Sequence, residues 1–317
     1  MSKFKGVNLN EVVKKLESIA PLRLAESWDN VGLLVEPSPP HVVQKLMLTN
    51  DLTQPVLTEA VQKKCNMIFS YHPPIFQAMK RLTQVDFKQK MIVQCLENRM
   101  AVFSPHTSHD VAEDGVNDWL LAAFGDVSDK HSVTKCEDIV CVEKSLLSES
   151  DQICLESAAG VDIKSSFGPF CYIPRQASLS LTPEAVTTIG CGRKALLKSP
   201  LTISQIVDLA KKHLKLPHIR VALGDGKTLG DNVKSVACCA GSGASVLRNC
   251  DAELYLTGEM SHHEVLHATS HGRSVILCEH SNTERGYLSC LQEKLTALLP
   301  SVEFVLSQLD ADPLIII

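Results

Sequence analysis

Five side chains that can bind a divalent cation stand in short polar stretches of this chain: His72, His106, Asp110, His280 and Glu284. His106 and Asp110 are four residues apart, as are His280 and Glu284, so each pair shares one face wherever a helical turn has begun. Neutral imidazole combined with carboxylate suits Zn, Mn, Fe or Co. The same spacing fits ordinary structure, because an aspartate can cap a helix and a glutamate is favoured in a first helical turn.

His72 is followed by two prolines, which stiffen the loop and favour an extended backbone at the residue before them. A rigid loop suits a metal ligand, although an ordinary surface turn can have the same sequence. A rival metal site lies on the predicted helix at residues 261–271. There, His263, His267 and His271 form a stripe along one face.

Three further positions are candidates for binding or proton transfer. Gly241, Ser242 and Gly243 follow an apolar run and precede a short helix, where backbone amides can bind a phosphate or a carboxylate. A tight turn between strand and helix is the competing explanation. Glu259 and His263 are residue types suited to general acid and base work.

Short apolar runs alternate along the chain with segments of helical spacing. The predicted strands are residues 43–49, 66–71, 101–104, 218–223, 233–240, 254–256, 274–278 and 302–306. The predicted helices are residues 9–19, 53–64, 87–100, 115–124, 203–214, 261–271 and 283–299. This alternation indicates an α/β protein, in which ligands bind beyond the carboxyl ends of the strands. The polar residues described above stand at such ends.

We therefore expect two interlinked α/β halves with mixed sheets, joined by a middle insertion. The first half is predicted at residues 1–126 and the second at 191–317. Residues 127–190 mix Ser, Asp and Glu with short apolar runs, which is typical of an insertion or linker module.

The composition limits the classes of protein that fit. With 317 residues, 44% of them hydrophobic and 21% charged, the chain can form a substantial core. The net charge of −5 argues against direct DNA binding, because phosphate affinity depends on clustered Lys and Arg. No apolar run reaches the ~18 residues of a membrane span. Twelve scattered cysteines without a CxxC pair favour a reducing compartment. We expect a cytoplasmic protein, with nuclear entry also open.

Six segments in this order resemble one protein family. In the first half they are AESWDNVGLLV at 25–35, YHPPIF at 71–76, and PHTSHD at 105–110 with GVN at 115–117. In the second half they are AGSG at 240–243, TGEMSHH at 257–263 and EHSNTERG at 279–286. The chain resembles the NGG-one-interacting-factor-three-like proteins, also labelled GTP cyclohydrolase I type 2 homologues, and its YHPP segment is similar to the eukaryotic branch.

The resemblance implies a dinuclear metal site with ligands from both halves. By position the ligands are His72, Asp110, His280 and Glu284, for one or two ions (Zn, Mn, Fe or Co) per chain. The family often has a second histidine where this chain has Tyr71, and neutral phenol is a weaker ligand than imidazole. Tyr71 or His106 is then the additional ligand, or one of the two metals binds weakly or is absent. The family's hexamers imply a homo-oligomer.

Two functions from different classes fit these expectations. The first is a divalent-metal-dependent hydrolase of unknown substrate, which uses metal-activated water with Glu259 or His263 moving the proton. The second is a transcriptional co-regulator or scaffold that acts through protein partners and carries a structural metal site. Storage or delivery of metal by the histidine-rich helix is a weaker third possibility.

Overall fold

The computed structural model describes residues 4–159, 163, 168–181 and 185–316. The chain forms two compact units, of which the first comprises Met1–His109 and Leu288–Ala311. The second comprises Asp110–Tyr287 and Asp312–Ile317. The units differ from the expected segments in two places, since residues 110–126 belong to the second unit and residues 288–311 belong to the first. Residues 160–162, 164–167 and 182–184 of the expected middle insertion lie outside the described residues.

The first unit is built on a five-stranded sheet. Its elements are β1 (Val7–Asn8), α1 (Leu9–Ile19), η1 (Leu22–Leu24), β2 (Gly32–Val35), β3 (Val42–Val43), β4 (Lys45–Thr49), α2 (Gln54–Gln62), β5 (Met67–Ser70), α3 (Phe87–Glu97), β6 (Ala101–Ser104), most of α10 (Tyr287–Leu298), and β16 (Glu303–Leu306).

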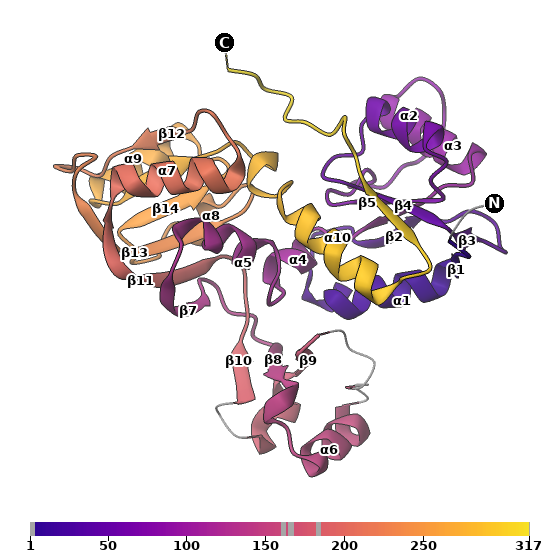
Figure 1. The fold of residues 1–317 in the computed structure, drawn as a ribbon, viewed down its shortest axis with the longest axis horizontal. Coiled ribbons are helices and arrows are strands. Elements are labelled where there is room, and N and C mark those ends of the chain that lie inside the picture. Colours follow the sequence, from indigo (N-terminus) through magenta and orange to yellow (C-terminus); the bar gives the residue numbers. More distant parts are fainter. Residues whose placement is uncertain (1–3, 160–162, 164–167, 182–184, 317) are drawn as a thin grey trace. The chain divides into compact units, whose positions relative to one another are not determined.

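The order of this sheet is β16-β4-β5-β6-β2, in which the first four strands run parallel and β2 runs antiparallel to β6. Figure 1 shows α2 and α3 on one side of the sheet and α1 with α10 on the other. Met47, Ile68 and Val102 from the three central strands pack against residues of α2 and α3. The carboxyl ends of β4, β5 and β6 therefore meet at one edge of a buried sheet.

The second unit contains a six-stranded sheet and a smaller one. Its elements are α4 (Thr107–Val111, from Asp110 onward), α5 (Val116–Leu121), η2 (Ala122–Phe124), β7 (Val127–Ser132), β8 (Ile139–Glu143), η3 (Lys144–Leu146), α6 (Glu149–Ala159), β9 (Phe170–Pro174), η4 (Arg175–Ser180), β10 (Val186–Thr188), β11 (Arg193–Thr202), α7 (Ile203–Leu214), β12 (Arg220–Ala222), β13 (Asn232–Cys239), α8 (Ala244–Leu247), β14 (Leu254–Thr257), α9 (His262–Ser270), β15 (Ser274–Leu277) and η6 (Ser281–Thr283).

The order of the larger sheet is β12-β15-β14-β13-β11-β7. Strands β13, β14 and β15 run parallel, while β12, β11 and β7 are antiparallel to their neighbours. Tyr255 and Val275 pack with Leu247 of α8 and Ala268 of α9. The carboxyl ends of three parallel strands again meet at one edge.

Strands β10, β8 and β9 form a separate antiparallel sheet inside the expected middle insertion. Buried side chains such as Val140, Leu155 and Ile173 give it a core of its own. All twelve cysteines are free thiols. No helix in the described part of the chain is long and apolar enough to cross a membrane. The expected class, an α/β protein with mixed sheets, is confirmed.

Candidate metal centre

In the first unit, candidate ligands follow two neighbouring parallel strands. His72 comes two residues after β5, and its backbone amide donates to the carbonyl of Asn50, 3.0 Å away, which fixes the loop beyond the end of the strand. Its ring Nδ1 lies 2.9 Å from Oδ1 of Asp51, a residue that follows β4. A carboxylate at Nδ1 favours the tautomer with its proton on that nitrogen, so Nε2 is the ring atom suited to a metal.

His106 follows β6 and is held in the same way. Its Nδ1 lies 2.8 Å from Oδ1 of Asp29, and the other Asp29 oxygen accepts from the Thr107 amide at 3.1 Å and the Thr107 hydroxyl at 2.6 Å. Burial raises the pKa of Asp29, but the hydrogen bonds from His106 and Thr107 outweigh it, so the pKa is lowered overall. His106 has φ of +37°, a strained backbone value of the kind that concentrates at functional sites.

The rings of His72 and His106 lie beside each other, with their centroids 5.3 Å apart. Tyr71, the residue that replaces a histidine of the resembled family, is fully buried and meets both rings edge-on, at 5.6 Å and 6.2 Å. The phenol thus packs against the imidazoles from inside the unit.

In the second unit, His280 and Glu284 form the corresponding pair. The Nδ1 atom of His280 lies 2.8 Å from Oε1 of Glu259, which follows β14. Its Nε2 atom lies 3.4 Å from Oε1 of the buried Glu284. The predicted helix at 283–299 begins later than expected, because η6 comes first and α10 starts only at Tyr287. The four-residue spacing nevertheless brings both side chains together.

Gly241 leaves room for this pair. A Cβ atom at Gly241 would lie 2.7 Å from Oε1 of Glu284 and 2.9 Å from Nε2 of His280, and the residue has φ of +63°. Gly258 lets the strand ends approach, since its Cβ would lie 2.5 Å from the Gly241 carbonyl oxygen and 2.8 Å from Cα of His280. The absence of two side chains therefore lets the turn at Gly241 and the strand end at Gly258 pack directly against His280 and Glu284. An imidazole and a carboxylate that lie this close together fit a divalent cation.

The anion-binding hypothesis for residues 241–243 loses two of its donors. The amide of Gly241 donates to the hydroxyl of Thr283 at 2.8 Å, and the amide of Gly243 donates to the hydroxyl of Thr257 at 3.0 Å. In this structure these two amides therefore hold the turn between β13 and α8.

The two candidates for proton transfer lie in different surroundings. Glu259 borders a cavity of about 410 Å³ together with Ser242, Ser245 and Ser261. His263 borders another cavity, of about 130 Å³, and does not line the one beside Glu259. Only Glu259 contacts a candidate ligand.

The histidine-rich stripe does not form a metal group. The rings of His267 and His271 lie close, with their centroids 4.4 Å apart. However, Nδ1 of His271 lies 2.7 Å from the His267 carbonyl oxygen, so it contacts the helix backbone. Among the described residues, this helix contains no group of metal-competent side chains.

Asp110 lies half-buried in α4. Its backbone carbonyl accepts a hydrogen bond from Nδ2 of the buried Asn117, at 2.9 Å.

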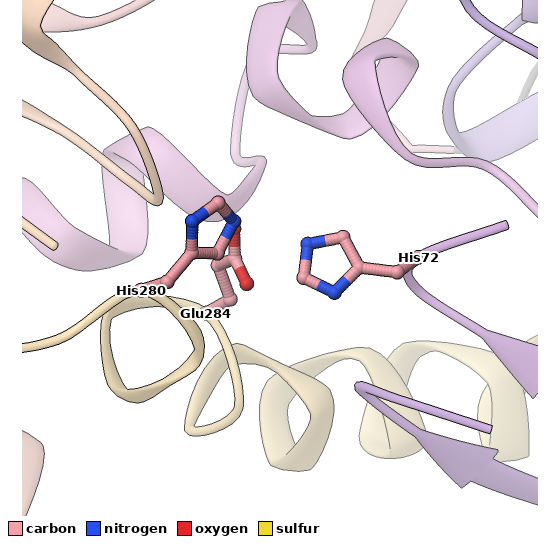
Figure 2. A group of neighbouring side chains, drawn as sticks. All are labelled: His72, His280 and Glu284. Carbon is pink, nitrogen blue, oxygen red and sulfur yellow. The ribbon is translucent and has the colours of Figure 1, made fainter. Parts of the chain in front are cut away.

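Of the four predicted ligands, His280 and Glu284 lie together in the second unit, with Nε2 and Oε1 3.4 Å apart. His72 belongs to the first unit, and Asp110 is not among the described side chains that could join such a metal-binding group. Figure 2 shows the side chains of His72, His280 and Glu284.

Sequence reasoning missed Asp51 and Asp29, which pair with His72 and His106, and named Glu259 for proton transfer rather than as the partner of His280. Two signals were available, because Asp51 directly follows a predicted strand and Asp29 lies in the first of the six family segments.

Comparison with known proteins identifies the family. The family model described as Duf34/NIF3 (NGG1p interacting factor 3) matches residues 7–313. NIF3-like protein 1 of Bos taurus is 44% identical, with 98% of this chain and 93% of the relative covered. NGG1-interacting factor 3 of Saccharomyces cerevisiae is 34% identical, with 96% of each covered. The crystal structure of a Bacillus cereus protein related to NIF3 has a TM-score of 0.76 at 24% identity, covering 99% and 100% of the chains. The chain belongs to the Duf34/NIF3 family.

Proposed function

We propose that this protein is a divalent-metal-dependent hydrolase whose ligands are His72, Asp110, His280 and Glu284. His106 is the additional ligand in place of the histidine that Tyr71 replaces. The observation that carries the proposal is the pairing of three imidazoles with carboxylates. His72, His106 and His280 each direct Nδ1 at a carboxylate oxygen 2.8 to 2.9 Å away, which leaves Nε2 as the ligand atom.

Such pairs of carboxylate and histidine are a common feature of metal sites, because the carboxylate fixes the ring and its tautomer and raises the basicity of the ligand atom. Glu284 is buried, and a divalent cation would stabilise its charged form there in addition to the nearby His280. A bound cation provides a Lewis acid and lowers the pKa of water. Glu259 borders a cavity beside His280 and is the residue placed to take up or return a proton.

The test begins with elemental analysis of protein purified without chelator. We expect one or two equivalents of Zn, Mn, Fe or Co, lost in the His280→Ala and Glu284→Gln variants and kept in His263→Ala. Hydrolysis of phosphoesters, nucleotides and amides is then assayed with the metal-loaded and the metal-free protein. Metal-free wild-type protein, or no metal-dependent turnover on any of these classes, contradicts the proposal.

A second candidate is a co-regulator or scaffold that binds protein partners, and the name of the yeast relative, NGG1-interacting factor 3, favours it. Partner capture with wild type and His280→Ala separates the two functions. Binding that survives loss of the metal supports the scaffold, and binding that requires the metal argues against it. A homo-oligomer, hexameric in the resembled proteins, and a cytoplasmic and nuclear address are further proposals, which light scattering and fractionation test.

A further inference from the structure

Asn117 connects two backbone segments that carry the candidate site of the second unit. Its side chain is fully buried in α5 and hydrogen-bonds through both its nitrogen and its oxygen, with a long contact from Nδ2 to Sγ of Cys191 at 4.0 Å as well. Nδ2 donates to the carbonyl oxygen of Asp110 at 2.9 Å, and Oδ1 accepts from the amide of Ala240 at 2.8 Å. One side chain thus ties the segment of a proposed ligand to the end of β13.

Thr283 continues the connection. Its hydroxyl accepts from the amide of Gly241 at 2.8 Å and donates to the carbonyl oxygen of His280 at 2.7 Å. Thr283 is also fully buried. Ala240 and Gly241 are joined by a peptide bond. Hydrogen bonds and this one peptide bond therefore connect Asp110 through Asn117 and Thr283 to His280.

We propose that Asn117 is a positioning residue, which sets Asp110 at a fixed place relative to His280 and Glu284. The inference rests on the proposed metal site. Its physical basis is that ligand atoms must be held to within about 0.5 Å of a productive geometry by groups that are themselves locked in place. An asparagine suits this position because its amide supplies a donor and an acceptor at once.

A purely structural role would give a different result. Any buried polar group that loses its partners destabilises the fold. If Asn117 only stabilised the unit, its removal would lower the melting temperature of the metal-free protein and leave the metal affinity of the folded protein unchanged. A positioning role requires the affinity and the coordination geometry to change beyond that effect.

The experiment compares Asn117→Ala, Thr283→Val and the double variant with wild type. Ser274→Ala is the matched control, because the buried Ser274 hydroxyl accepts from the Gly224 amide at 3.1 Å and stands at the first residue of β15, the end of that strand away from His280. The readouts are the melting temperature of the metal-free protein, the Co²⁺ dissociation constant and the visible absorption spectrum of bound Co²⁺, which reports ligand geometry.

We expect Asn117→Ala and Thr283→Val each to weaken Co²⁺ binding by about 10- to 100-fold and to alter the spectrum. The double variant should lose less than the product of the single losses, because both residues act in one series. Ser274→Ala should be less stable with unchanged affinity and spectrum. Should Asn117→Ala fail to fold, the affinity and spectrum of Thr283→Val decide.

Unchanged Co²⁺ affinity and spectrum in the folded variants overturn the inference while leaving the proposed function intact. A wild-type protein that binds neither Co²⁺ nor Zn²⁺ overturns the proposed function itself, and the positioning role with it.

Discussion

The pairing of Glu259 with His280 makes a prediction that separates metal binding from folding. The change is Glu259→Gln, which preserves the size of the side chain and removes its charge. An amide can donate to Nδ1 as well as accept from it, so His280 is no longer restricted to the tautomer that presents Nε2 to a metal.

The size of the effect follows from exposure. Loss of such a carboxylate partner costs 10- to 100-fold in metal affinity. The side chain of Glu259 is 49% exposed and that of His280 is 36% exposed, so solvent screens the pair. We therefore expect the lower end, about tenfold or about 1.4 kcal/mol in binding free energy. The melting temperature of the metal-free protein should hardly change, because exposed ion pairs add little stability.

The assay is competition for Zn²⁺ between the protein and a chromophoric chelator. The matched control is Glu264→Gln, since Glu264 borders the same cavity and hydrogen-bonds the backbone amide of Ser261 rather than a histidine. Equal Zn²⁺ affinities for wild type and Glu259→Gln would refute the reasoning that this carboxylate prepares His280 for a metal. An equal loss in both variants would show only the effect of local negative charge.

Three further predictions concern stability and close packing. Burial raises the pKa of Glu59, but its hydrogen bonds hold the pKa at about 2. The stability that this depressed pKa contributes is therefore complete above about pH 4.5 and is lost as the pH falls towards 2, a dependence that urea titrations should show reduced in Glu59→Gln. Arg193→Leu leaves Asp118 without the buried guanidinium that lies 2.9 Å away and should cost about 3–5 kcal/mol of unfolding free energy in denaturant titrations. Gly258→Ala forces a Cβ atom to within 2.8 Å of Cα of His280 and should lower the melting temperature and the metal affinity together. A variant with the melting temperature and metal affinity of wild type would show that the strand ends are not closely packed.

Much of the fold could be predicted from local pattern. The helix Leu9–Ile19 and the strand Ala101–Ser104 have the bounds that the sequence predicts, because an apolar face and a short buried run are strong signals. Strand β11 was missed, since its exposed residues and its proline resemble a loop and only pairing with β13 and β7 makes it a strand. The pairing of β16 with β4 joins residues more than 250 positions apart, which no local pattern contains.

The candidate site, like the fold, could be predicted from the sequence only in part. The types and spacing of His280 and Glu284 predicted a ligand pair, and the structure brings their side chains together. The partners of the imidazoles could not be predicted, because Asp29 reaches His106 across 77 residues. Asn117 belonged to a family segment, but its role depends on contacts with Asp110 and Ala240 that only the fold creates.

The measurement that tests the central claim most directly is anomalous X-ray scattering from crystals of protein purified without chelator. We predict a strong metal peak at about 2.0–2.2 Å from Nε2 of His72, Nε2 of His280 and a carboxylate oxygen of Glu284. A second peak, if both positions are filled, should be bound by Asp110 or His106. A fully loaded crystal whose only peak lies on the histidines of α9, or one in which His72 and His280 bind different ions, contradicts the claim that both units hold one metal centre.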